Sequence, residues 1–231
     1  MKRNHLPIIL GMALIALLMG SCDALFENQF GNAGLGKPSD AEIAAQASDS
    51  NPAVAQPALA LQVDNKLKAS GAAPIVENLV PTLINEGSKL STIGTNSGDM
   101  NTFLEKLVPS ETLDDPVALA KAINGIISTG VELDALANSA GASTSYAASG
   151  INTQQLATTA VLATVFKTMT VVGTSTAANV GEALAEFVTT PGAIITDYID
   201  FTAFSTTDLT ASGTTANTLL LLAGIDVGSW L

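Results

Sequence analysis

The stretch QQLATTAVLATVFKTMTVV, residues 154–172, decides the fold. Its apolar side chains are spread around the whole circumference of a helix, and Lys167 is its only charged residue. A helix that is apolar on all sides is either buried in the core of a protein or spans a membrane. The many threonines, Lys167 and the marginal length disfavour a membrane span. We therefore expect residues 154–172, opened by Asn152 and Thr153, to form the central and most buried helix.

The flanking segments carry apolar residues at intervals of three and four, which is typical of amphipathic helices. They predict helices over residues 57–70, 76–84, 103–108, 116–131, 180–188, 194–202 and 214–225. The expected fold class is therefore all-α, a single irregular helical bundle of about six to eight helices. It takes up residues 57–231, with a long loop over residues 138–150.

At four places the sequence does not decide whether a predicted helix continues. Pro81 lies inside a predicted helix and should kink or restart it, because proline lacks the N–H and clashes with the preceding turn. Gly125 and Gly130 each cost up to about 1 kcal/mol relative to alanine in a helix interior. Close helix packing is the expected reason, with a break near Gly130 as the alternative. The threonine-rich residues 206–215 also permit a strand.

The amino terminus reads MKRNHLPIILGMALIALLMGSC, residues 1–22. Lys2 and Arg3 are followed by an apolar core over residues 6–19 and then by the small residues Gly20 and Ser21. This order is the layout of a secretory signal peptide, and the apolar core is short for a membrane-spanning helix.

The end of this segment, Met19-Gly20-Ser21-Cys22, resembles the lipobox of bacterial lipoproteins, with Met19 where leucine is usual. The resemblance implies that the Cys22 thiol receives a diacylglyceryl group. Cleavage would then remove residues 1–21 and leave Cys22 as the new amino terminus, held in the membrane by acyl chains such as palmitate. Residues 22–56 are rich in small and polar residues, a composition that buries little surface, and we expect them to form a lipidated flexible tether.

Composition restricts the chemistry of the rest of the chain. Beyond residue 21, seven lysines face 21 acidic residues, a balance of −14, and no arginine remains. This charge opposes binding to nucleic acid and to anionic lipid headgroups. His5 is the only histidine and lies in the signal segment, and Cys22 is the only cysteine. The usual ligands of zinc, haem and iron-sulfur clusters are therefore missing, and we expect no cofactor, no metal and no enzymatic activity.

Three remaining groups of polar residues give only weak support to a catalytic or metal-binding hypothesis. Asp114 and Asp115 could act as an acid/base pair, although acids before a proline are typical helix caps. A loop with Asn96, Asp99 and Asn101 could hold calcium, but it more simply caps a helix. Ser88, Lys89 and Ser91 could supply a serine nucleophile beside a lysine, at a spacing that does not support that chemistry.

The sequence thus predicts a lipid-anchored protein of the bacterial cell envelope. It leaves open the inner or outer membrane and the periplasmic or surface-facing side. The expected role is a non-enzymatic interaction or structural module, with a protein partner and with the membrane contacted through acyl chains. The alternative is a carrier or sensor that binds an apolar ligand such as a lipid between helices lined by alanine, valine, isoleucine and Phe166.

Overall fold

The computed structural model describes residues 38–86, 102, 104–139, 151–200, 202–203, 205 and 207–224. Within these residues the fold is all-α, as predicted, with ten α-helices, one 3₁₀ turn and one pair of two-residue strands. The helices are α3 (Asp40–Ala47), α4 (Pro52–Ser70), α5 (Ala73–Glu86), α7 (Ser110–Leu113), α8 (Pro116–Ser128), α9 (Gly130–Ser139), α11 (Thr153–Thr168), α12 (Val180–Thr189), α13 (Thr207–Thr210) and α14 (Thr215–Leu222). Residues 104–107 are also helical, as expected.

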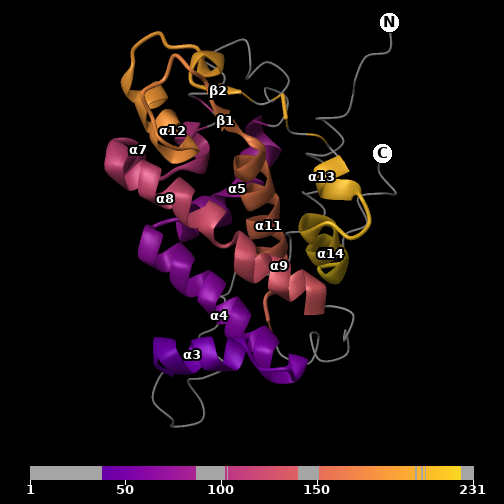
Figure 1. The fold of residues 1–231 in the computed structure, drawn as a ribbon. Coiled ribbons are helices and arrows are strands. Elements are labelled where there is room, and N and C mark those ends of the chain that lie inside the picture. The colour runs from indigo at the N-terminus through magenta and orange to yellow at the C-terminus, as the bar shows by residue number, and fades with distance from the viewer. Residues whose placement is uncertain are drawn as a thin grey trace, which may run out of the picture.

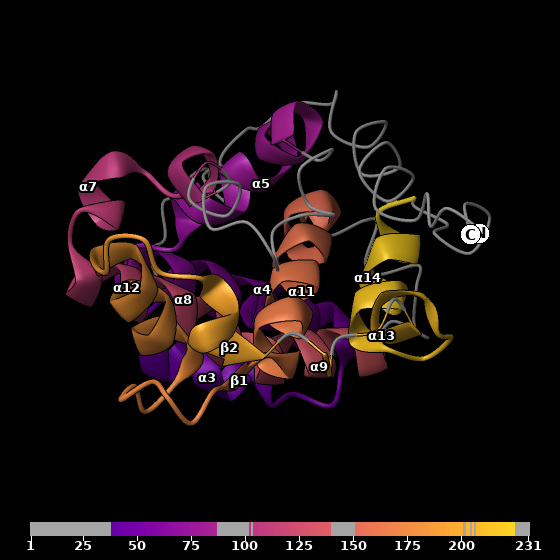
Figure 2. The ribbon, with the colours of Figure 1, turned by 90° about the horizontal axis from the view of Figure 1, so that it is seen from above.

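Helix α11 lies in the middle of the bundle, as predicted, between α8 and α5 on one side and α14 on the other (Figures 1 and 2). Asn152 caps its first turn by accepting a 3.1 Å hydrogen bond from the Gln155 N–H. Half of its sixteen residues are buried, including two threonines whose hydroxyls bond to the helix's own carbonyls. That internal bonding lets polar threonines lie in the core, since buried polar groups need a partner.

The predicted central helix ends four residues early, at Thr168. The backbone turns extended at Met169, and β1 (Thr170–Val171) pairs antiparallel with β2 (Ile199–Asp200). Residues 194–202 are therefore not the predicted helix, because they form the 3₁₀ turn η3 (Ile195–Asp197) followed by β2. Pairing with a strand about thirty residues away outweighs the helical spacing of the isoleucines.

The predicted tether over residues 22–56 is wrong in its second half. Residues 40–47 form α3, which packs on α4, and α4 begins at Pro52. Local signals explain both helices: Ser39 and Glu42 form a reciprocal capping box, and Asn51 caps α4 with proline at its first position. Ile43 is 3% exposed, so even this small helix adds an apolar side chain to the interior.

Four other predictions are resolved by the helix bounds. Pro81 lies within α5, which continues past it to Glu86, so the helix does not restart there. The expected helix over residues 116–131 divides at Thr129, so the alternative of a break near Gly130 is confirmed. The strand alternative for residues 206–215 is wrong, because α13 begins at Thr207. The expected loop over residues 138–150 is wrong at its start, since α9 runs through Ser139.

Glycine allows two close helix contacts. A side chain at Gly125 of α8 would place its Cβ 2.1 Å from Ser70 Oγ of α4. One at Gly181 of α12 would place its Cβ 2.5 Å from the Ala120 carbonyl oxygen of α8. The expectation that Gly125 serves close packing is confirmed, and α8 is held tightly between α4 and α12.

One continuous apolar core connects the helices from α4 to α14. Its largest fully buried side chains are Leu67, Ile75, Leu107, Leu119, Ile123, Ile126, Leu133, Leu136, Leu156, Phe187 and Ile195. At its edge, Lys66 of α4 contacts the Glu132 carboxylate of α9 at 2.6 Å and donates to the Ser128 carbonyl at 2.8 Å. Among the helices in the described part of the chain, none is both long enough and apolar enough to cross a bilayer.

Candidate functional site

Most of the residues that the sequence singles out lie outside the described residues. Cys22, the predicted lipidation site, is among them, as are the proposed calcium ligands Asn96, Asp99 and Asn101. The Ser88, Lys89 and Ser91 group lies outside them as well. These assignments stay predictions.

The structure does describe Asp114 and Asp115, and it separates their roles. The Asp115 carboxylate accepts hydrogen bonds from the N–H groups of Val117 at 2.9 Å and Ala118 at 3.1 Å, which makes it the amino-terminal cap of α8. Asp114 ends the preceding short helix α7. The interpretation as a helix cap is confirmed for Asp115, whose carboxylate accepts from the first turn of α8, whereas Asp114 bonds to α7 through its backbone N–H.

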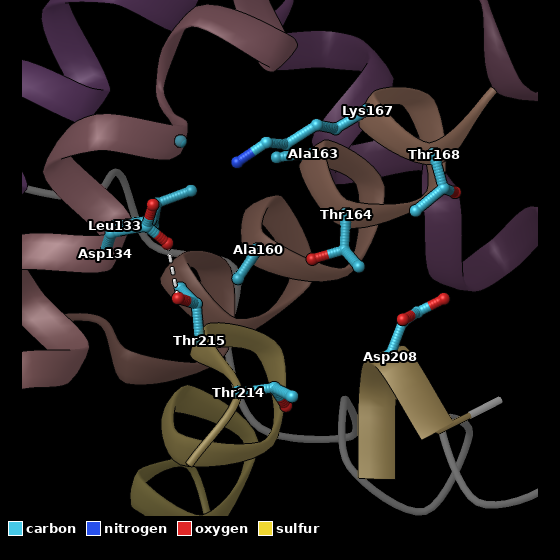
Figure 3. A pocket seen from close by; sticks show the side chains of 11 residues that line it. Leu133, Asp134, Ala160, Ala163, Thr164, Lys167, Thr168, Asp208, Thr214 and Thr215 are labelled. Atoms are coloured by element: carbon cyan, nitrogen blue, oxygen red, sulfur yellow. Dashed lines mark hydrogen bonds between the residues drawn. The ribbon is translucent and has the colours of Figure 1, made fainter. Parts of the chain in front are cut away.

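A polar pocket of about 220 Å³ opens where α9, α11, α13 and α14 meet (Figure 3). Its apolar lining comes from Leu133, Ala160 and Ala163, which are buried. The remaining side chains that line it carry hydroxyl or charged groups. They are Asp134 of α9, Thr164, Lys167 and Thr168 of α11, Asp208 of α13, and Thr214 and Thr215 at the start of α14.

Hydrogen bonds fix two walls of this polar pocket. The Thr215 hydroxyl donates to the Asp134 carboxylate, joining α14 to α9 across the pocket (Figure 3). The Ser205 N–H donates to Asp208 Oδ2 at 2.8 Å, which ties that carboxylate to the turn before α13. Each bond uses one carboxylate oxygen, and the partly buried Asp134 and Asp208 retain a second oxygen that can accept a hydrogen bond.

Among the described residues that line the polar pocket, Lys167 is the only cationic one. In Figure 3 the Lys167 side chain leaves α11 with its ammonium group directed toward Leu133 and Asp134 of α9, and Asp208 lies on the other side of Thr164. In the described part of the chain, the two ion pairs are Lys66 with Glu132 and Lys68 with Asp64. The Lys167 ammonium therefore pairs with no carboxylate there, and it can bind an anionic group.

Sequence reasoning misses the polar pocket. It treats Lys167 only as a charge that disfavours a membrane span. Asp134 and Asp208 lie 33 residues before and 41 residues after it. Only the packing of α9 and α13 against α11 brings the three charges to one opening.

A second buried polar group lies near the end of α9. Gln56 of α4 is completely buried, and its Nε2 donates to the Ser139 carbonyl at 3.0 Å and to the Ser139 hydroxyl at 3.2 Å. Its Oε1 has no hydrogen-bond partner among the residues that the structure describes. Within the described residues, no three acidic side chains gather closely enough to hold a metal ion.

Comparison with known proteins finds no matching family model, no similar curated protein and no similar solved structure.

Proposed function

We propose that this protein is a lipid-anchored component of the bacterial cell envelope that acts as a non-enzymatic interaction or structural module. The observation that carries the proposal is the segment Met1–Cys22, in which a basic start, a short apolar core and two small residues precede the only cysteine of the chain. A single cysteine at the end of a signal-like segment has an evident use as an acylation site.

The charge of the chain supports anchoring by lipid. With seven lysines against 21 acidic residues beyond residue 21, the protein is repelled by anionic headgroups. Acyl chains overcome that repulsion, because each buried methylene contributes about 0.8 kcal/mol and two or more chains give durable attachment. Membrane association would then resist high salt, which weakens only electrostatic binding.

The supply of reactive side chains supports a non-enzymatic role. Beyond the signal segment the chain holds no histidine and no arginine, and its one cysteine is the proposed anchor. Proton transfer near neutral pH and the clamping of anionic substrates usually depend on these residues. The adjacent acids Asp114 and Asp115 are the strongest sequence candidate for acid/base chemistry, and the Asp115 carboxylate caps α8 instead.

Fractionation tests the anchor. Wild-type protein should stay with the membrane after a high-salt wash and should incorporate labelled palmitate, whereas Cys22→Ser should do neither. A matched control, Cys22→Ser combined with Thr196→Cys, returns a thiol at an exposed position of η3 and should remain unlabelled. The proposal fails if Cys22→Ser remains membrane-bound, or if the wild type carries no label.

The alternative role, a carrier of an apolar ligand, predicts a different outcome. Native mass spectrometry of the purified protein would find a lipid bound in addition to the anchor, whereas an interaction module would carry the anchor alone. The polar pocket does not favour the carrier, because Asp134, Lys167 and Asp208 place three charged groups in its lining.

A further inference from the structure

We propose that the polar pocket binds a small α-amino acid in its zwitterionic form, with the ligand's carboxylate at Lys167 and its ammonium group at Asp208. The inference rests on the pocket alone and not on Cys22, so it stands or falls separately from the proposed anchoring.

Charges of both signs at one opening carry the argument. Lys167 is unpaired within the described residues, and Asp134 and Asp208 add two carboxylates to the same lining. A simple anion would be attracted by Lys167 but repelled by the two carboxylates. A simple cation would be attracted by the carboxylates but repelled by Lys167. A ligand that carries both charges close together satisfies both sides, because opposite charges then face each other across the contact.

The hydrogen bonds already present leave the necessary atoms available. Asp208 uses one oxygen to accept from the Ser205 N–H, and its second oxygen can accept from an ammonium group. The Thr164 hydroxyl lies between Lys167 and Asp208 in Figure 3 and can donate to or accept from either end of the ligand. Asp134 accepts a hydrogen bond from the Thr215 hydroxyl and forms the wall of the polar pocket on the α9 side.

The size and the lining of the polar pocket narrow the ligand class. Drug-sized ligands occupy pockets of roughly 300–1,000 Å³, so about 220 Å³ suits a smaller molecule. The eleven described residues that line it include no aromatic ring on which a sugar or a base could stack, and no arginine that could clamp a phosphate. The buried surfaces of Leu133, Ala160 and Ala163 can accept a short aliphatic or hydroxylated side chain.

Calorimetric titration of the purified full-length protein with each of the twenty common L-amino acids tests the inference. We expect at least one small amino acid to bind. Its N-acetyl derivative, which lacks the ammonium charge, and its carboxamide, which lacks the carboxylate, should each bind at least about tenfold more weakly, a loss of about 1.4 kcal/mol.

Two variants connect each charge with its partner in the chain. Lys167→Met keeps most of the side-chain length and should abolish the preference for the amino acid over its carboxamide. Asp208→Asn keeps an oxygen for the Ser205 N–H and should abolish the preference over the N-acetyl derivative. Lys121→Met and Asp197→Asn change exposed charges that do not line the pocket and should bind as the parent does.

Several outcomes would overturn the inference. Absence of binding by all twenty amino acids, equal binding of the charged and the blocked forms, or unchanged affinity in Lys167→Met would each refute it. Circular dichroism of every variant separates a lost ligand contact from a lost fold.

Discussion

Replacing Gly125 with alanine should destabilise the protein by about 2 kcal/mol. The new Cβ would lie 2.1 Å from Ser70 Oγ and 2.3 Å from Ser70 Cβ, far inside ordinary contact, so α8 and α4 must move apart. Inserting a methyl group into a well-packed contact costs about 1–3 kcal/mol, and a clash with two atoms places this site at the upper end. The gain in helix propensity returns at most about 1 kcal/mol.

Two further variants separate steric crowding from helix propensity. Gly130→Ala adds the same methyl group at the start of α9, where nothing lies within 4 Å, and should leave stability unchanged or raise it by up to about 1 kcal/mol. Ser70→Gly removes both clashing atoms, so the double variant Gly125→Ala/Ser70→Gly should recover most of the loss that Gly125→Ala causes.

Urea unfolding followed by far-ultraviolet circular dichroism measures these differences through the midpoint at constant slope. The coupling between positions 125 and 70 in the double-mutant cycle should exceed about 1 kcal/mol in the favourable direction. If Gly125→Ala unfolds at the same urea concentration as the parent, or if Ser70→Gly gives no recovery, the close contact between α4 and α8 is not what requires glycine.

Other contacts give predictions of the same kind. Asp115→Ala should cost about 1 kcal/mol because it removes the cap of α8, whereas Asp114→Ala, whose side chain caps nothing, should cost little in the same urea assay. Gly181→Ala should cost more than about 1 kcal/mol, since its Cβ would meet the rigid Ala120 carbonyl, and an unchanged urea midpoint would contradict this. Hydrogen bonds from Ser39 lower the pKa of Glu42, so the capping box is complete above the ordinary glutamate pKa and is lost as the pH falls through the lowered value. An NMR titration of the Glu42 carboxyl should therefore have a midpoint below that of glutamate in an unstructured peptide.

Sequence patterns predict the elements whose signals are local. Residues 154–168 are apolar around the whole circumference, which requires burial, and α11 lies at the centre of the bundle. The caps at Asn152 and Asp115 act within three residues and are equally visible in the sequence. The helix expected over residues 194–202 fails because its outcome depends on Thr170–Val171, a partner that no local window contains.

The polar pocket is hidden from the sequence for the same physical reason. Asp134, Lys167 and Asp208 each look like an ordinary solvated charge on its own helix. Their proximity depends on how α9, α13 and α14 pack around α11, and that packing follows from the shape of the shared core, which no spacing rule encodes.

Because α3 begins at Asp40, the distance between the bilayer and the first helix of an anchored molecule would be limited. Under the proposed acylation, Ser39 follows Cys22 by only 17 residues, because α3 and the start of α4 belong to the bundle. At about 3.5 Å per residue, a fully extended segment from Cys22 to Ser39 would be about 60 Å long. This is half the length of a tether that ends at residue 56. A partner that contacts the start of α3 would therefore have to come within about 60 Å of the bilayer.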